Sequence, residues 1–427
     1  MNLTVLQQAC NNQSSILYPM KTEKINPNNM KKTIIIICLA LWALNGFSQS
    51  TADTLQEKLT AIDGKLNALD ERVALNESDL GKLTKIKVSG YIQAQFINYQ
   101  DGLLKNNDAN NTFFVRRARI KVTYEATDGL KFVLQPDFAT GNLSLKDAYA
   151  VASLPKLRSL ALWAGQFNRP NYEVEYSSSQ REVMERSRVI LNLYPGEREV
   201  GAKLEFTPVT VPLKLQAALL NGNFTGNQLN DVDSKKDLMA RATYSLKFPG
   251  AGVGIDFGAH IYYGGLMAKN KYILNYENVL DSTSSNAGSY MDKKWGGAEM
   301  QVYFDVLGGL ALKGEYLAGK NAFAGDSKSN PNKTKEFSGY YAYLIKNIGK
   351  KNQLVGRYDY FDPNTKLSGD GAGKDIYYKT LAVAWQYYLN DNIRVSVQYT
   401  MPKNETNTAN PEDIADNVFT LRVQAKF

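Results

Sequence analysis

Residues 417–427, Asn-Val-Phe-Thr-Leu-Arg-Val-Gln-Ala-Lys-Phe, carry an apolar side chain at every second position from Phe419 to Phe427. Polar or basic residues, including Arg422 and Lys426, fill the positions between. Successive side chains of a strand point to opposite faces, so this period of two predicts a strand with one apolar and one polar face. Two structures fit such a strand: the wall of a transmembrane barrel, with lipid outside and water inside, and the edge of a soluble sandwich.

The composition of the whole chain favours the barrel. The 427 residues include 26 tyrosines, 32 glycines and only 13 prolines, and the mean hydropathy is −0.36. A helical membrane protein would carry runs of about 20 apolar residues, and the one long apolar run, at residues 33–44, is shorter. A transmembrane barrel combines a polar average with many interfacial tyrosines because its apolar residues alternate with polar ones.

The apolar run at residues 33–44 is typical of a secretory signal peptide. Lys31 and Lys32 precede it, and residues 46–48 supply small side chains at the positions that a signal peptidase tests. We therefore expect residues 1–48 to be a leader and signal peptide that is removed before Gln49. Both cysteines lie in this segment, so we expect no disulfide or thiol chemistry in the mature protein. The segment holds four lysines and one glutamate, so its removal lowers the net charge from +8 to +5.

Residues 49–85 have a different period. Apolar side chains and one asparagine recur at alternating steps of four and three, the a/d pattern of a coiled coil over about four heptads. These positions are Leu55, Leu59, Ile62, Leu66, Leu69, Val73, Asn76, Leu80 and Leu83. Cations at the g positions face acidic residues at the following e positions, as between parallel helices. We expect a coiled-coil oligomerisation segment; a single amphipathic helix lying on another surface is the alternative.

From Ile86 to Phe427 the period is two almost throughout. Alternation predicts strands near residues 86–98, 113–125, 130–138, 143–152, 159–167, 200–206, 213–221, 238–248, 252–263, 295–306, 309–319, 337–346, 352–361, 376–389, 391–401 and 417–427. The number is even, as a closed bacterial barrel requires. Gly308-Gly309 and Asn390-Asp391 predict tight turns, and residues 272–294 and 325–335 predict long outer loops. The predicted fold is all-β: a sixteen-stranded antiparallel transmembrane β-barrel preceded by the coiled-coil helix.

Alternation also divides the barrel wall into two faces. Within residues 114–124, apolar side chains share the lipid face, while Arg117, Arg119 and Lys121 share the other face. Three cations on one face are costly in a sandwich core and stable beside water, which favours the barrel. Arg116 breaks the pattern, and we expect it on the lipid face with its head reaching the interface. The same alternation directs inward the cations Lys131, Lys203, Lys214, Arg241, Lys313, Arg357, Arg394, Arg422 and Lys426, and the acids Asp137, Glu205, Asp256, Glu299, Glu315 and Asp359.

Several motifs follow one another in a specific order along the barrel region. They read Phe-Phe-Val-Arg-Arg-Ala-Arg at 113–119, Gln-Pro-Asp-Phe at 135–138, Lys-Asp-Ala-Tyr at 146–149, Ala-Gly-Gln-Phe-Asn-Arg-Pro at 164–170, Glu-Arg-Ser at 185–187, Gly-Glu-Arg-Glu-Val-Gly at 196–201 and Arg-Tyr-Asp-Tyr-Phe-Asp at 357–362, before the terminal Phe427. In this order they resemble the phosphate-selective porins O and P, over nearly all of residues 86–427. The resemblance implies a homotrimeric outer-membrane porin, in contact with lipid and lipopolysaccharide, whose third loop folds inward. It also implies that Phe427 is the signal read by the barrel-assembly machinery.

By this resemblance residues 168–199 form the constricting loop, with a helix expected near 180–188. Arginine forks match phosphate oxygens, and rings of such side chains give pores anion selectivity. The loop contributes Arg169, Arg181, Arg186, Arg188 and Arg198 to the candidate anion pathway, and the wall contributes Arg117, Arg119, Lys121, Arg241, Arg357, Arg422 and Lys426. The alternative is that the loop arginines pair with Glu173, Glu175, Glu182, Glu185, Glu197 and Glu199.

Other classes of function fit the sequence less well. Hydrolysis needs a histidine near a serine or a carboxylate, and the chain has one histidine, His260, on the same strand face as Asp256. A metal site is not expected either, because the expected mature chain has one histidine and no cysteine to serve as ligands. Cations placed in the lumen account for the basic net charge, so the charge does not point to nucleic-acid binding. We expect a porin of the Gram-negative outer membrane, with no cofactor, for passive diffusion of small hydrophilic solutes and leaning to anions such as phosphate or polyphosphate. The coiled coil is then periplasmic; a structural or adhesive barrel with a non-conducting lumen is the alternative.

Overall fold

The computed structural model describes residues 84–427 with gaps at 101–109, 140, 142, 155–156, 172–173, 223–230 and 232, and residues 58, 60–73, 76 and 81 before them. The chain divides into two compact units, Asn2–Lys85 and Ile86–Phe427. The predicted signal peptide at residues 1–48 lies outside the described residues.

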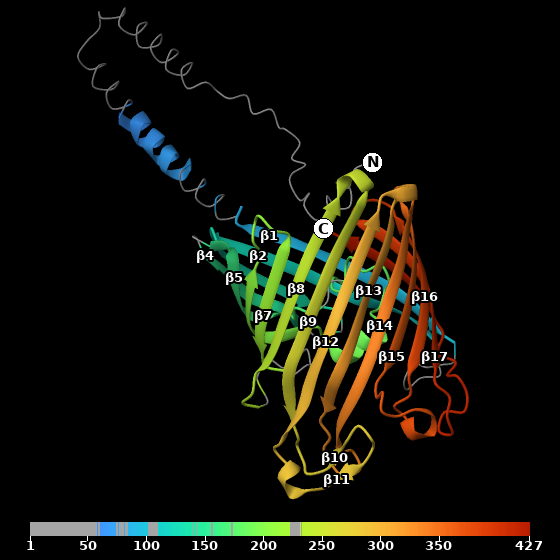
Figure 1. Cartoon of the computed structure of the whole chain (residues 1–427). Coiled ribbons are helices and arrows are strands. Elements are labelled where there is room, and N and C mark those ends of the chain that lie inside the picture. The colour runs from blue at the N-terminus through green and yellow to red at the C-terminus, as the bar shows by residue number, and fades with distance from the viewer. Residues whose placement is uncertain are drawn as a thin grey trace, which may run out of the picture. The chain divides into compact units, whose positions relative to one another are not determined.

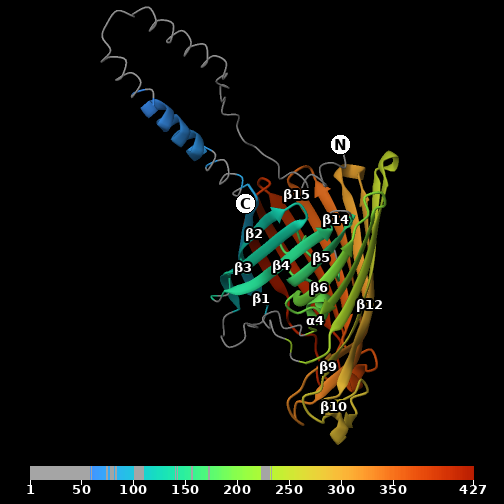
Figure 2. The same cartoon turned by 90° about the vertical axis from the view of Figure 1, so that its left-hand side faces the viewer.

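The second unit is a β-barrel whose sheet closes on itself (Figures 1 and 2). Its wall strands are β1 (Ile86–Tyr99), β2 (Asn111–Thr127), β3 (Leu130–Asp137), β4 (Ser144–Leu154), β5 (Leu157–Asn168), β6 (Arg198–Phe206), β7 (Leu213–Leu220), β8 (Asp237–Phe248), β9 (Val253–Met267), β12 (Tyr290–Phe304), β13 (Leu310–Phe323), β14 (Asn332–Ile348), β15 (Asn352–Asp362), β16 (Tyr378–Tyr388), β17 (Ile393–Asn404) and β18 (Val418–Lys426). Each pairs antiparallel with the next, and the sixteen predicted strands correspond to them one to one.

The barrel closes where the last strand meets the first. β18 pairs antiparallel with β1, from Tyr91 opposite Lys426 to Tyr99 opposite Val418. Gly90 and Phe427 extend this ladder, because each backbone N–H donates to the other's carbonyl over 3.0 Å. β1 also pairs with β2, so no free edge is left at this seam. The prediction that residues 417–427 complete the barrel is confirmed.

Long loops join the strands at one end of the barrel, here called the long-loop rim, and short turns join them at the other, the short-turn rim. Residues 305–309, with the 3-10 helix η3 (Val306–Gly308), and residues 389–392 form two of the short turns, as predicted. The long loop predicted at 272–294 lies at residues 268–289, because β9 ends at Met267 and β12 begins at Tyr290. This loop holds the two-residue strands β10 (Ile273–Leu274) and β11 (Leu280–Asp281) and η2 (Ser284–Asn286). The remaining 3-10 helices are η1 (Pro249–Ala251) and η4 (Gly369–Ala372).

The wall has an apolar outer face and a polar inner face. In β16, Leu381, Val383 and Trp385 are exposed, whereas the neighbouring Thr380 and Gln386 are buried. The predicted inward residues with buried side chains are Arg117, Arg119, Lys203, Arg241, Arg357, Arg394, Arg422, Asp137, Glu299, Glu315 and Asp359. An outer band of apolar side chains around a charged interior is the pattern of a transmembrane barrel.

The expectation that Arg116 lies on the lipid face is wrong. A β-bulge interrupts the pairing of β1 with β2, so that Gln93 faces Arg117 while Ala94 faces Val115, and Arg116 has no partner residue on β1. The extra residue re-aims the side chain, as bulges do. Arg116 turns inward and makes two hydrogen bonds of 3.0 Å to the Glu185 carboxylate.

The described part of the first unit is helical at residues 58, 60–73, 76 and 81. Its a/d side chains Ile62, Leu66, Leu69 and Val73 are exposed. The helix agrees with the predicted period, and its pairing with other helices stays a prediction. Within the described residues, no helix is both long and apolar enough to cross a membrane.

Candidate functional site

The segment between β5 and β6, residues 169–197, lies inside the barrel and is here called the inner loop. Its backbone is held by side chains of strands remote from β5 and β6 in the sheet. The Ser178 carbonyl accepts from Gln93 of β1 over 3.0 Å, and the Ser179 carbonyl accepts from Gln424 of β18 over 2.9 Å. Gln398 of β17 accepts from the Met184 N–H over 2.7 Å. The wall thus satisfies the polar backbone of a loop that has left solvent, and the expected inward folding is confirmed.

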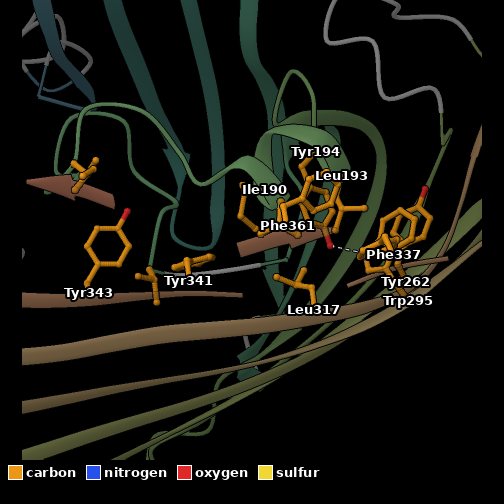
Figure 3. Close-up of a cluster of buried hydrophobic side chains, with 14 of the residues drawn as sticks. Ile190, Leu193, Tyr194, Tyr262, Trp295, Leu317, Phe337, Tyr341, Tyr343 and Phe361 are labelled. Atoms are coloured by element: carbon orange, nitrogen blue, oxygen red, sulfur yellow. Dashed lines mark hydrogen bonds between the residues drawn. The ribbon is translucent and has the colours of Figure 1, made fainter. Parts of the chain in front are cut away.

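The inner loop is anchored by an apolar cluster at its second half. The helix α4 (Arg188–Leu193) buries Val189, Ile190 and Leu193, and it contacts β14 and β15. Figure 3 shows Ile190, Leu193 and Tyr194 facing the wall residues Tyr262, Trp295, Leu317, Phe337 and Phe361. Trp295 Nε1 donates to Tyr194 Oη over 2.7 Å, the bond drawn in that view.

The helix expected near residues 180–188 is therefore misplaced. The Met184 N–H bonds to Gln398 of the wall, and the Ser187 N–H donates to the carboxylate of Glu175 in the same loop over 2.8 Å, so these groups are not used for helical hydrogen bonds. The helix begins only where the apolar run Val189-Ile190 can pack, which shows tertiary contacts overriding local pattern.

Three of the loop-region arginines are neutralised by neighbouring carboxylates. Arg169 lies 3.3 Å from Glu199, and Arg198 lies 3.0 Å from Asp147. Arg186 pairs with Glu197. Pairing with the loop glutamates, the alternative left open by the sequence, describes Arg169 and Arg186, and it describes Arg198 through its second partner, Glu197, at 2.6 Å.

Loop carboxylates also pair with cations of the wall. Glu175 accepts from Arg357 over 3.2 Å, and Glu182 accepts from Lys313 over 2.5 Å. Glu185 is shared, because it accepts from both Arg116 and Arg422. These pairs join the loop to β2, β13, β15 and β18.

The remaining candidate residues lie apart from one another. Arg119 pairs with Asp137 at 2.7 Å and Arg241 pairs with Glu299. Arg188 stacks over the Tyr378 ring at 3.8 Å and lies 3.9 Å from Asp416. Lys121 is half-buried and Lys426 is exposed, and neither makes a side-chain hydrogen bond or ion pair with the residues that the structure describes.

Two wall arginines that bond to residues 178–185 are paired with wall acids: Arg119 with Asp137 and Arg357 with Asp359. Five more guanidiniums gather around this segment of the inner loop, and we call them the arginine cluster: Arg116, Arg117, Arg181, Arg394 and Arg422. Arg181 and Arg422 converge on one acceptor, the Met184 carbonyl, over 3.3 and 3.0 Å. Arg117 donates to Gln93 over 2.8 Å, Gln93 donates to Gln424 over 2.7 Å, and Arg394 donates to Gln424 over 3.3 Å. Hydrogen bonds therefore link the cluster to itself and to the loop.

The arginine cluster is short of negative charge. Within the described part of the chain, Arg117, Arg181 and Arg394 have no carboxylate within 4.0 Å, and each side chain is at most 7% exposed. Buried N–H groups also lack an acceptor there: the Nε of all three residues and the Nη2 of Arg181. Burial lowers the pKa of Arg181, and the neighbouring Arg186 lowers it further. Desolvated cations with unused donors are a site for an anion.

Sequence reasoning missed Arg116 and left Arg394 out of the anion pathway. A signal for Arg116 exists, because Phe113-Phe114-Val115 places three apolar residues in a row and so breaks the alternation where the bulge occurs. Arg394 has no such signal. Its position beside the cluster follows only from the pairing of β17 with β18, in which it lies opposite Gln424.

His260 is part of the packed wall. Its Nε2 lies 3.3 Å from Tyr194 Oη, and its Nδ1 lies 3.6 Å from Glu315 Oε1. No group of three or more histidine, cysteine, aspartate or glutamate residues in the described part could hold a metal ion.

The family model of phosphate-selective porins O and P matches residues 86–427. The chain belongs to this family. It is therefore an outer-membrane β-barrel porin for passive diffusion, and a member of a family of channels and not of enzymes.

Solved structures show the same fold at low sequence identity. OprB of Pseudomonas putida matches this porin with a TM-score of 0.58 and 11% identity, over 83% of this chain and 97% of that chain. The loop L8 deletion mutant of OmpT, an outer membrane protein of Vibrio cholerae, matches with a TM-score of 0.51 and 11% identity, over 80% of this chain and 99% of that chain. No curated protein sequence matches the chain.

Proposed function

We propose that this porin favours anions, with phosphate or polyphosphate among its solutes, and that the arginine cluster is where the passing anion is recognised. The proposal rests on the burial and the unused hydrogen-bond donors of Arg117 and Arg181. Both are buried, neither has a carboxylate within 4.0 Å in the described residues, and both keep N–H groups without an acceptor. A partly dehydrated anion can accept these hydrogen bonds as it passes.

The charge balance of the cluster supports selectivity by sign. Among the described residues, Glu185 is the one carboxylate within 4.0 Å of the five guanidiniums, while Glu175 and Glu197 act on Arg181 from farther away. Positive charge is therefore in excess at the cluster. A low-dielectric wall strengthens the field of such charges, so a cation meets a barrier where an anion meets a well. The paired residues Arg119, Arg169, Arg186, Arg198, Arg241 and Arg357 shape the lumen and hold the loop, and Lys121 and Lys426 add positive charge outside the cluster.

Phosphate added to a chloride-carried current tests the proposal. With the porin reconstituted in planar bilayers, we expect phosphate to reduce the current in a saturable manner, since a divalent oxyanion would occupy the cluster longer than chloride. A current that phosphate leaves unchanged contradicts phosphate recognition. A reconstituted porin without conductance would favour the structural or adhesive alternative.

The assembly proposed for this porin is a homotrimer in a Gram-negative outer membrane. The heptads of residues 49–85 support it, because an exposed a/d stripe is buried when helices from neighbouring subunits associate in the periplasm. The terminal Phe427 supports recognition by the barrel-assembly machinery, as the family resemblance implies. The proposed domain organisation has three parts: residues 1–48, which are removed during export, the coiled-coil segment at residues 49–85, and the channel at residues 86–427.

A further inference from the structure

A pocket lies between α4 and the barrel wall at the long-loop rim, and no residue of the arginine cluster lines it. It has a volume of about 270 Å³ and is formed by α4, the rim ends of β13 to β16 and the loop before β16. None of the cations that line it belongs to the arginine cluster. The function proposed above leaves this pocket without a role.

The polar side of the pocket is cationic. Arg188, Lys335 and Lys374 line it together with a single carboxylate, Asp375, which pairs with Lys335. Lys374 is exposed and has no side-chain partner among the described residues. Arg188 keeps a one-third exposed side chain, with Asp416 at 3.9 Å as its nearest acid. Two cationic heads therefore remain available to a solute.

The apolar side of the pocket is aromatic and rigid. Phe337 and Phe361 line it and are each 3% exposed, because they belong to the apolar cluster that holds α4 (Figure 3). Tyr378 lies at the edge of the pocket, where the Arg188 guanidinium stacks on its ring. Packed rings of this kind need no reorganisation to accept a flat apolar group.

We infer that this pocket binds small aromatic anions, that is, one planar ring bearing carboxylate or phosphate groups. The ring would lie against Phe323, which lines the pocket and is 37% exposed, with the buried Phe337 and Phe361 behind it, and the anionic groups would reach Arg188 and Lys374. An inorganic anion would use the cations and leave the aromatic floor empty. A neutral aromatic solute would leave the cations unpaired. Only a solute with both features uses the whole pocket.

The inference rests on the proposed function in one respect: the bound solute is taken to be on its way through an anion-conducting pore. The pocket would raise the local concentration of aromatic anions beside the inner loop, as a weak site at a channel mouth does. Binding must be weak enough to allow release, so we expect saturation at millimolar concentrations, about −4 kcal/mol.

Equilibrium binding tests the inference directly. Isothermal titration calorimetry of the full porin in detergent, with isophthalate and succinate as probes, compares an aromatic with an aliphatic dianion. We expect isophthalate to bind about tenfold more tightly, since only its ring buries apolar area against the phenylalanines. Equal affinities would show that the aromatic floor plays no part and would overturn the inference.

Charge variants locate the site. Lys374→Gln and Arg188→Gln should each weaken isophthalate binding about fivefold, the loss of a partly exposed charge–charge contact. Lys328→Gln is the matched control, because Lys328 is an exposed lysine of the loop between β13 and β14 and does not line the pocket. If the control weakens binding as much as the two test variants, the pocket is not the site.

Conductance separates this inference from the proposed function. If the porin passes no current, the proposed function fails, while calorimetry still decides whether the pocket binds aromatic anions. If phosphate blocks the current and the two dianions bind equally, the proposed function stands and this inference is wrong.

Discussion

Arg422 Nη2 on the closing strand lies 2.8 Å from Glu185 Oε1 on the inner loop, and the two residues are 237 positions apart in the chain. Arg116 binds the same carboxylate from β2, which lies on the other side of β1, through two hydrogen bonds of 3.0 Å. One acidic side chain thus connects the strand that closes the barrel, the bulge of β2 and the loop that occupies the lumen. The position of the loop therefore depends on barrel closure.

Replacing Glu185 with glutamine should loosen the inner loop. The substitution leaves the guanidiniums of Arg116 and Arg422 without their carboxylate. We expect a cost of ~1–3 kcal/mol, below that of a fully buried pair because the Glu185 side chain is 36% exposed. Single-channel recording should show a noisier current. The control is Glu125→Gln, which removes the exposed partner of Lys87; equal noise in both variants would contradict the anchoring role.

The apolar side of α4 offers a second test of loop docking. Ile190 is fully buried and the next residue, Leu191, is 50% exposed. Ile190→Ala should cost ~2–5 kcal/mol by leaving a cavity in the cluster, whereas Leu191→Ala should cost little. Hydrogen exchange at the amides of residues 188–194 measures the difference. Similar exchange rates in the two variants would mean that the cluster does not hold the loop.

Gly90 is the position where the barrel seam tolerates no side chain. A Cβ at Gly90 would lie 2.5 Å from the Arg119 carbonyl oxygen and 2.6 Å from Phe427 Cζ. Because the first contact is backbone, β1 or β2 must shift, and we expect Gly90→Ala to cost ~1–3 kcal/mol. Gly356→Ala is the control, since a Cβ there meets nothing within 4 Å. Thermal unfolding in detergent should give a lower midpoint temperature for Gly90→Ala than for Gly356→Ala. Equal midpoint temperatures would contradict the close packing at Gly90.

The wall of this barrel is predictable from the sequence because lipid and water impose opposite demands on alternate residues. β16 shows this, since its alternation predicts residues 376–389 and the strand runs from Tyr378 to Tyr388. The positions of the side chains and of the inner loop inside the lumen are harder to predict from the sequence. Arg116 departs from its expected face because of one bulge, and the helix expected at 180–188 is displaced by hydrogen bonds to the wall.

The arginine cluster shows the same limit. Arg394 and Arg181 are 213 residues apart in numbering, and only closure of the sheet around a folded-in loop brings both to the same short segment. No local period carries that information. The pairing of Arg169 and Arg186 with Glu199 and Glu197, by contrast, was foreseeable as an alternative, because these acids belong to the same predicted loop, whereas Asp147, a partner of Arg198, lies on β4.

The heptads of residues 49–85 predict self-association of that segment. A peptide of residues 50–85 should form a parallel oligomer, because its exposed a/d stripe gains burial and its g cations gain e anions. Sedimentation equilibrium measures its mass, and a trimer is expected. A monomeric peptide would contradict the coiled coil while leaving association through the barrel walls possible.

The reversal potential in a potassium chloride gradient tests the central claim most directly, because it reports which ion the pore prefers. The account predicts that chloride permeates better than potassium. It also predicts that the Arg117→Gln/Arg181→Gln double variant lowers the permeability ratio about fivefold, the equivalent of ~1 kcal/mol, and that Lys121→Gln lowers it less. A wild-type porin that prefers potassium, or a double variant indistinguishable from Lys121→Gln, would contradict anion recognition at the arginine cluster.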